Sequence, residues 1–407
     1  MSEGVAFAPS LVTATGTSPD RGATTSVRSV ADAALAWRDG RIAYVGAAAD
    51  LPDEFAGLPS TRVGGAIVPG FVDCHTHLPF FGWRADEFEA RLAGVSYRDL
   101  QGEGGGILRS RRLLAGAADD EVLAFCLPLA QEMLVHGTTA LELKTGYGLS
   151  VDGELRQARL ARALSEDIPQ EAVVTLLSCH ATPPEYTREQ WVEEVCSTII
   201  PAAAAEALVD MVDVYVEDIA FSVDDLRKVA ESAARAGLPF RCHADQLGHS
   251  GAAEAAVRMG CRSADHLNHA GPEGVKALGS AEETAAVLLP VSTLFLRADP
   301  PPVADLIDAG AAIALATDFN PGTSPCLSMP EVVATGCSLY GLSTDAALAA
   351  STLNPAWVLG LHERHGTLEV GKRANFVVLD SPSFAMVPYR PGHNPVASVW
   401  LAGEPVS

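Results

Sequence analysis

The middle of the chain alternates short apolar runs with longer stretches in which apolar residues recur every three or four positions. The short runs indicate buried strands, and the longer stretches indicate helices that cover them. Helices are predicted over 119–136, 152–166 and 223–236, and glycines in VHGTT and AGLPF precede new strands. Eight strands are predicted, in AIVPGFVDC from Ala66, TTALELK from Thr138, AVVTLLSC from Ala172, MVDVYVE from Met211, LPFRC from Leu238, SADH from Ser263, AAVLLPV from Ala285 and AAIALATD from Ala311.

Strand and helix alternate throughout this region, and that order decides the predicted fold class. Nearly continuous apolar strands separated by helices indicate a parallel sheet with helices on its faces. Eight repeats over roughly 250 residues favour a closed (β/α)8 TIM-like barrel over an open sheet. The sequence therefore predicts an α/β protein built on such a barrel.

The two ends of the chain have a different pattern. AALAWRDGRIAYVG alternates apolar and polar residues around Asp39 and Gly40, which predicts a hairpin. GTLEVGKRANFVVLD and ASVWLAGEPV predict further short strands near the C-terminus. We expect both ends to join in one small β-sandwich domain, with residues 1–65 as its N-terminal part, 66–350 as the barrel, and 351–407 as a C-terminal helix and strands that complete it.

Composition narrows the functional classes. The 407 residues are 48% hydrophobic and 19% charged, which suits a globular protein with a sizeable core. The formal charge of −23 argues against a nucleic-acid partner, and an anionic substrate would need local cations to capture it. Apolar runs of membrane-spanning length and a signal peptide are both lacking, so a cytoplasmic location without a membrane partner is expected. The eight cysteines form no CxxC pair and are read as reduced, structural thiols.

The predicted strands end in residues that carry chemistry. His75 and His77 follow the first strand, and residues i and i+2 of a strand point to the same side, so their imidazoles can form half of a metal site. Active sites of (β/α)8 barrels lie at the carboxyl ends of the strands. The other strand ends supply His180, Glu217, His243, His266 and Asp318. Five of the eleven histidines thus gather at one mouth, whereas the other six, His136, His249, His269, His362, His365 and His393, are expected in helices or loops.

Several motifs resemble a known family. DCHTH, RCHAD, SADHL and ATDFNPGTSP resemble the amidohydrolase superfamily, and HTHLPFFGWR, GVSY, EGGGILRS, ELKTGYGL and SCHATPPEY resemble the imidazolonepropionases within it. The resemblance runs from about residue 30 to the end. It implies a homodimeric hydrolase of histidine degradation that opens 4-imidazolone-5-propanoate to N-formimino-L-glutamate. It also implies one divalent metal, zinc or iron, held by His75, His77, His243 and Asp318.

The expected catalytic roles fall on three residues. Asp318, close to a water on the metal, can take its proton and return it to the leaving ring nitrogen. His266 is expected as a nearby acid or polariser, and His180 as a hydrogen-bond partner of the carbonyl, although these two roles can be exchanged. Glu217 stands where superfamily members with two metals carry a lysine; we expect one metal, and a Glu217 that fixes a ligand histidine.

A propionate on the substrate requires a cation, and Arg84 is the predicted partner. Tyr97 and Tyr147 match ring-contacting tyrosines of the family, although core packing is their alternative. Gln246, Asn320 and Gly322 are the other expected contacts of the substrate, together with His180.

Three rival functions stay open at this point. Another lactam hydrolase would use the same metal chemistry. Many deaminases of this fold carry a glutamate three residues after the strand-five histidine, where this chain has Gln246, and a neutral amide cannot carry a proton. A metal-free binding scaffold would have no use for the complete ligand set.

Overall fold

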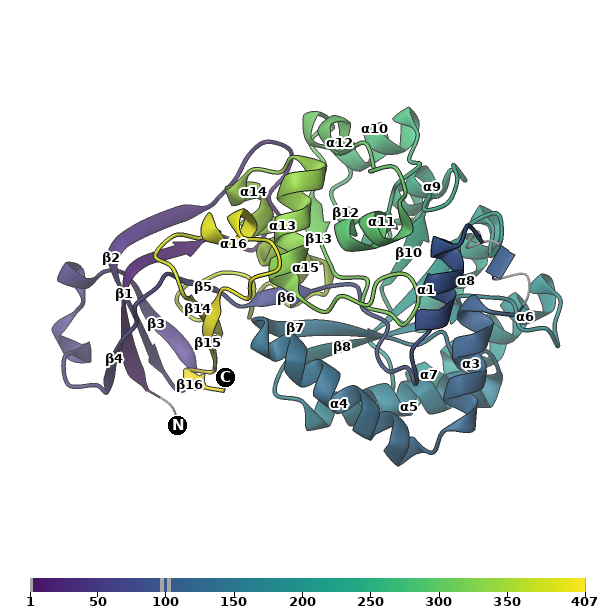
Figure 1. Cartoon of the computed structure of the whole chain (residues 1–407), viewed down its shortest axis with the longest axis horizontal. Coiled ribbons are helices and arrows are strands. Elements are labelled where there is room, and N and C mark those ends of the chain that lie inside the picture. The colour runs from purple at the N-terminus through teal and green to yellow at the C-terminus, as the bar shows by residue number, and fades with distance from the viewer. Residues whose placement is uncertain (1–2, 96–98, 101–103, 407) are drawn as a thin grey trace.

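Eight parallel strands form one of the two sheets of the molecule (Figure 1). The computed structural model describes residues 3–95, 99–100 and 104–406. Neighbouring strands pair in sequence order, as a (β/α)8 barrel requires. The strands are β6 (Phe71–Asp73), β7 (Thr138–Lys144), β8 (Glu171–Cys179), β9 (Met211–Val216), β10 (Phe240–Ala244), β11 (Ser263–His266), β12 (Ala285–Leu288) and β13 (Ile313–Leu315).

The barrel closes where the chain segments that follow its first and last strands meet. The backbone N–H of Asp318 donates to the carbonyl of His75 at 3.0 Å, and that of His77 donates to the carbonyl of Phe319 at 2.9 Å. Thr76 and Phe319 form a parallel bridge at the same place. This seam therefore brings together two strand ends that lie more than 200 positions apart in the sequence.

Helices surround the strands, and the predicted ones are confirmed to within a residue or two. The largest core cluster lies between strands and helices. Among the described residues, every helix is too short or too polar to cross a bilayer. The α-helices are α1 (Ala85–Leu92), α3 (Gly106–Gly116), α4 (Asp119–Val135), α5 (Val151–Asp167), α6 (Arg188–Glu194), α7 (Ile200–Ala205), α8 (Val223–Arg235), α9 (Ala252–Met259), α10 (Pro272–Ser280), α11 (Pro290–Leu296), α12 (Val303–Ala309), α13 (Met329–Tyr340), α14 (Thr344–Ser351), α15 (Leu353–Val358) and α16 (Met386–Tyr389). Shorter helical turns are the 3-10 segments Ala48–Asp50 and Asp53–Phe55 and the π-helical segment Val195–Ile199.

The second sheet contains strands from both ends of the chain and confirms the predicted small β domain (Figure 1). The sheet curls so that Trp37, from the N-terminal strands, packs against Phe376 and Trp400, from the C-terminal strands, with ring centroids 5.9 and 5.7 Å away. Asp39 and Gly40 both have positive φ and turn the predicted hairpin. The strands are β1 (Gly4–Thr13), β2 (Arg28–Arg38), β3 (Arg41–Ala47), β4 (Ser60–Arg62), β5 (Ile67–Pro69), β14 (Phe376–Leu379), β15 (Val396–Leu401) and β16 (Glu404–Pro405).

Several predicted strands have other bounds in the structure, among them β10 and β13, and two of the differences have a clear physical cause. The segment from Ala66 is two strands, because β5 pairs with β1 and β14 of the small sheet before β6 enters the barrel. Gly70 makes the crossing possible, since a Cβ there would lie 2.1 Å from the Thr139 hydroxyl. The segment from Ala285 ends as a strand at Leu288, and Pro290 begins α11 because proline suits the first turn of a helix.

The predicted domain boundaries stay a proposal, and two elements bear on them. β5 belongs by pairing to the small sheet although it follows residue 65. α15 follows residue 350, yet its Ala356, Trp357 and Val358 share an apolar cluster with barrel strands and cover one end of the barrel.

Glu171, at the start of β8, joins the barrel to the segment that leads into the small sheet. One carboxylate oxygen accepts from Arg364 at 3.1 Å, and the other lies 2.8 Å from His365 Nε2. Burial alone would raise the pKa of Glu171, but His365 and Arg364 lower it from 4.5 to about 2. A carboxyl whose pKa is lower in the folded state stabilises the fold above its unfolded pKa, and that stabilisation is lost as pH falls toward 2.

We therefore expect Glu171→Gln to lower the free energy of unfolding at pH 7 by about 1–2 kcal/mol, after allowance for the partial exposure of the carboxylate. The difference from the wild type should shrink steadily between pH 4.5 and pH 2. Urea unfolding at a series of pH values measures it. A difference that is the same at pH 7 and pH 3 would contradict the assignment.

Candidate metal centre and active site

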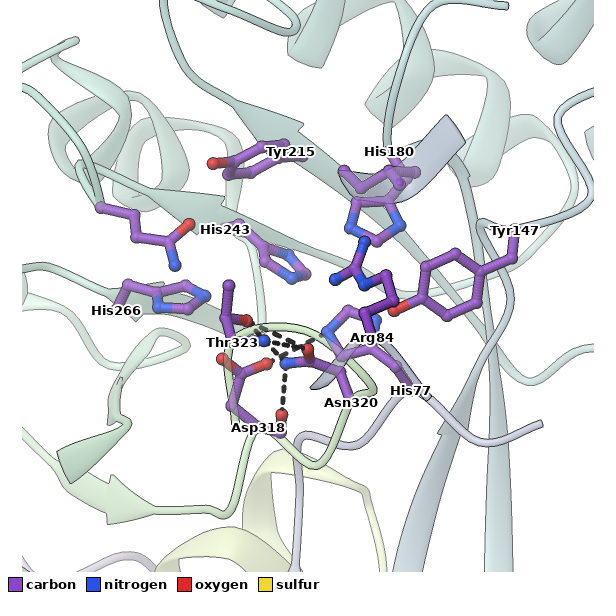
Figure 2. Close-up of a pocket in the computed structure, with 12 residues that line it drawn as sticks. His77, Arg84, Tyr147, His180, Tyr215, His243, His266, Asp318, Asn320 and Thr323 are labelled. Carbon is purple, nitrogen blue, oxygen red and sulfur yellow. Dashed lines mark hydrogen bonds and ion pairs between the residues drawn. The ribbon is translucent and has the colours of Figure 1, made fainter. Parts of the chain in front are cut away.

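Four side chains meet at the closing seam of the barrel. His75 and His77 follow β6, His243 lies on β10, and Asp318 follows β13. Asp318 Oδ1 lies 3.2 Å from His77 Nε2 and 3.6 Å from His75 Nε2. Ligand atoms of the three histidines all lie within 4.8 Å of one another, and so do those of His75, His266 and Asp318. The structure thus brings together the whole predicted ligand set. Figure 2 shows three of the four, His77, His243 and Asp318, with His266 beside them.

The donor atoms of this cluster suit a metal ion. His75 Nε2, His243 Nε2 and Asp318 Oδ2 are buried and have no hydrogen-bond partner in the described part of the chain. Burial first, and then Lys144 and the neighbouring histidines, lowers the pKa of His75 and of His77 well below the usual value. Neutral imidazoles and a carboxylate around one point are what a divalent transition metal binds. The residues present therefore fit the metal that the sequence predicted.

Carboxylates behind two of the histidines fix their orientation. His75 Nδ1 lies 2.6 Å from Asp265 Oδ2, and His243 Nδ1 lies 3.1 Å from Asp213 Oδ2. A carboxylate at Nδ1 accepts the proton there and leaves Nε2 free for a metal. Sequence reasoning missed both aspartates. Asp265 immediately precedes His266 in the sequence, and Asp213 lies on β9, the strand that pairs with β10 of His243.

Glu217 lies at the predicted strand end but has other hydrogen-bond partners than the predicted one. Its Oε1 accepts the backbone N–H groups of Gln246 and Leu247, at 2.5 and 2.8 Å, so it holds the loop after β10. The prediction that it fixes a ligand histidine is therefore wrong, because Asp213 and Asp265 contact His243 and His75 instead. Burial raises the pKa of Glu217 to about 7.

A cavity opens onto the cluster. Seven residues singled out from the sequence as catalytic or substrate-contacting line it, and Ile107, Tyr215 and Thr323 are additions that sequence reasoning missed. The full lining is His77, Arg84, Ile107, Tyr147, His180, Tyr215, His243, Gln246, His266, Asp318, Asn320 and Thr323.

Arg84 is the cation of this cavity. Its side chain is 2% exposed and lies 3.6 Å from Glu87. Nε and Nη1 are buried without a hydrogen-bond partner among the described residues. Figure 2 shows the guanidinium close to His180 and Tyr147, over the metal cluster. A buried guanidinium with unused N–H groups is a site for a carboxylate.

The loop after Asp318 supports Arg84. Asn320 Oδ1 accepts the backbone N–H groups of Gly322 and Thr323, at 2.9 and 2.7 Å, and its Nδ2 donates to the Asp318 carbonyl at 2.6 Å. These bonds use the amide of Asn320 within its own loop. Gly322 is needed for space, because a Cβ there would lie 1.4 Å from Arg84 Nη2. Both predicted residues are thus at the site, where they shape the loop and the arginine's position.

His180 is held in one tautomer. Its Nδ1 lies 3.1 Å from the Gly146 carbonyl, which accepts a hydrogen bond, so Nδ1 carries the proton and Nε2 keeps a lone pair. Burial lowers its pKa well below the usual value, with the neighbouring His77 as the next cause. The ring stacks on His77 with centroids 5.2 Å apart. A neutral His180 in this tautomer accepts protons at Nε2 and does not donate them.

His266 and Asp318 share an uncommon backbone conformation at their strand ends. Their φ angles are 76° and 54°, in the left-handed region that most residues other than glycine avoid. Such strain gathers at functional sites, where the surrounding structure holds it. Burial lowers the pKa of His266 to about 3 and raises that of Asp318. Tyr97, the remaining predicted contact, lies outside the described residues.

Known proteins similar to this chain share most of its length. The profile of the amidohydrolase family matches residues 66–406. The imidazolonepropionase of Cupriavidus taiwanensis is 45% identical over 93% of this chain and 91% of its own length. That of Rubrobacter xylanophilus is 42% identical over 91% and 90%. The chain belongs to the imidazolonepropionase family of amidohydrolases.

Solved structures of other proteins show the same fold at low sequence identity. A guanine deaminase from C. acetobutylicum matches with a TM-score of 0.73 and 16% identity, over 100% of both chains. A triazine hydrolase variant matches with a TM-score of 0.76 and 14% identity, over 99% of this chain and 94% of the other. These proteins thus share the fold of this chain, whereas at such identity their substrates carry no argument for it.

Proposed function

We propose that this protein hydrolyses the cyclic amide C–N bond of 4-imidazolone-5-propanoate to give N-formimino-L-glutamate, a step of histidine degradation. One observation carries the proposal: the same cavity is lined by three members of the metal-binding quartet and by Arg84, whose Nε and Nη1 have no hydrogen-bond partner in the described part of the chain. Water activation and carboxylate recognition are the two tasks that this substrate sets. The imidazolonepropionases that share more than 40% of the sequence support the same substrate.

His75, His77, His243 and Asp318 would hold one divalent metal, zinc or iron. Bound there, the metal would polarise a water molecule so that it attacks a carbonyl at neutral pH. The quartet is open toward the cavity, since His77, His243 and Asp318 all line it. A single ion suits this chain, because Glu217, the acidic residue at the fourth strand end, is engaged by backbone N–H groups.

Asp318 has the position for the proton transfers. Oδ2 is buried and free of hydrogen bonds within the described chain, so it can accept the proton of the attacking water. The oxygen of that water bonds to the ring carbonyl carbon, the C–N bond breaks, and Asp318 returns the proton to the departing nitrogen. One water is consumed, and no other reactant is needed.

The two remaining histidines take complementary parts. His180 offers the lone pair of Nε2, which suits proton acceptance from the substrate or from water. His266, across the cavity, is then the candidate for a hydrogen bond to the carbonyl oxygen. This exchanges the two roles expected from the sequence.

Arg84 would bind the propionate, and Tyr147, Tyr215 and Gln246 would surround the ring. The buried guanidinium supplies the local positive charge that an anion needs near a protein of net charge −23. A cytoplasmic homodimer without nucleic-acid or membrane partners stays a prediction from the sequence.

The deciding experiment follows the ultraviolet absorbance of the imidazolone ring with purified protein. We expect turnover that is lost after removal of metal by a chelator and restored by added Zn²⁺ or Fe²⁺. No turnover of this substrate, combined with turnover of another lactam or of an aminated ring, would overturn the assignment.

A further inference from the structure

Five charged side chains lie inside the barrel behind the metal centre, and all of them are closed to solvent. We call them the ion chain. They come from four strands, β7, β9, β10 and β11. In order, they are Asp265, Arg241, Glu142, Lys144 and Asp213.

One arm of the ion chain begins at His75. Asp265 Oδ2 lies 2.6 Å from His75 Nδ1 and 2.5 Å from Arg241 Nη2. Arg241 Nη1 then reaches Glu142 Oε1 at 3.0 Å and donates to the Cys74 carbonyl at 2.8 Å. Each carboxylate therefore meets a cation or an imidazole N–H at hydrogen-bond distance.

The other arm ends at His243. Lys144 Nζ lies 2.9 Å from Glu142 Oε2 and 2.6 Å from Asp213 Oδ2. Asp213 Oδ2 in turn lies 3.1 Å from His243 Nδ1. Burial would raise the pKa of Asp213, but His243 and Lys144 hold it well below the usual value. The ion chain is thus continuous from one ligand histidine to the other.

The interior of such barrels is normally filled by branched apolar side chains, so five charges there need a reason. Burial of charges is expensive, and the net gain over apolar packing is small or negative. Three carboxylates and two cations alternate in sign, which leaves one net negative charge beneath the cluster. At each end of the ion chain an aspartate contacts the Nδ1 atom of a metal-site histidine, and stability alone would not require these two contacts.

We propose that the ion chain is one positioning device for both histidines, and that Lys144 and Glu142 set metal affinity although neither contacts a ligand histidine in the described structure. Lys144 holds Asp213 against His243, and Glu142 holds Arg241, which in turn holds Asp265 against His75. The proposal rests on the metal site proposed above. His77 gives a contrast within the same cluster, because its Nδ1 is buried with no partner in the described residues.

The test uses Co²⁺ as the metal, with two variants that keep side-chain volume and remove one charge, Lys144→Met and Glu142→Gln. The dissociation constant of Co²⁺ is measured by competition with a chelator, beside the visible spectrum of the bound ion. We expect both variants to bind Co²⁺ about 10- to 100-fold more weakly, with a changed spectrum, as losses behind metal ligands do. Glu142→Asp keeps the charge and should recover part of the affinity.

Leu176→Ala is the matched control for lost stability. Leu176 lies on β8, next in sequence to Thr175, whose hydroxyl donates to Glu142, but it is buried in the cluster between strands and helices. This variant should lower the melting temperature and leave the Co²⁺ dissociation constant unchanged. Variants of the ion chain that unfold at lower temperature but bind Co²⁺ within twofold of the wild type would overturn the proposal.

If the proposed metal site itself were wrong, the wild type would bind no Co²⁺, which distinguishes that failure from a failure of the positioning role. If the charge variants did not fold, a measurement on the wild type alone would still test the positioning role. Long-range ¹⁵N correlation spectra of the histidine rings in the metal-free protein should show the proton on Nδ1 of both His75 and His243. A proton on Nε2 of either ring would refute the positioning role.

Discussion

Replacing Asp318 by asparagine is expected to lower kcat by about 10²–10⁴-fold, the range that a positioned general acid or base contributes. Asparagine keeps the size of the side chain but cannot take a proton from water, and it is a weaker metal ligand than a carboxylate. The loop after β13 should survive, because Asn320 bonds to the backbone carbonyl of residue 318, which the substitution keeps. The loss should therefore be one of chemistry and not of folding.

Two measurements separate the possible causes. Elemental analysis of the purified variant reports how much metal is retained, and steady-state kinetics with saturating metal report the proton-transfer defect. Asp305→Asn, on the exposed surface of α12, is the matched control and should behave as the wild type. If the asparagine variant with a full complement of metal kept kcat within threefold of the wild type, Asp318 would not be the proton carrier.

The parts of this fold that the sequence predicted are those governed by local patterns. Period and length distinguish strands from helices, and glycine marks where helices end, so β7 and β11 are matched residue for residue. The site followed from one rule about topology, since strand ends of a parallel barrel share a mouth. His75, His243 and Asp318 could be grouped without any knowledge of distances.

What the sequence did not predict depends on contacts across the barrel. Glu142 and Arg241 are charged residues within largely apolar strands, and nothing local shows that they pair 99 positions apart in the chain. Glu217 was placed at the right mouth but assigned the wrong partner, because only the structure shows which backbone N–H groups face it. The same holds for Tyr215, which points into the cavity although its neighbours are core residues.

The electrostatics of the site reconcile an acidic protein with an anionic substrate. The charges behind the metal centre sum to one negative charge, and the carboxylate of Asp318 adds another, which favours a cation at the quartet. Arg84 lies on the cavity side of the cluster (Figure 2). Opposite signs on the two sides of one cavity would orient the proposed substrate with its ring toward the metal and its propionate away from it.

Replacing Arg84 by methionine should therefore lower kcat/KM for the propanoate substrate by about 10²–10³-fold, as loss of one partner of a buried charge pair does. Methionine fills much of the same volume and removes only the N–H groups and the charge. A 4-imidazolone with an ethyl group in place of the propionate provides the complementary change. With that substrate the wild type and the variant should differ by less than about threefold, since neither forms the pair.

Arg111→Met is the matched control, because Arg111 also bears a guanidinium but pairs with Glu185 at 2.9 Å and does not line the cavity. It should leave kcat/KM for both substrates close to the wild-type values. Equal losses for the two substrates in the Arg84 variant would show a general distortion of the mouth. A loss confined to the substrate with the carboxylate assigns recognition of that group to Arg84, because the uncharged substrate reports on the same ring chemistry in the same cavity.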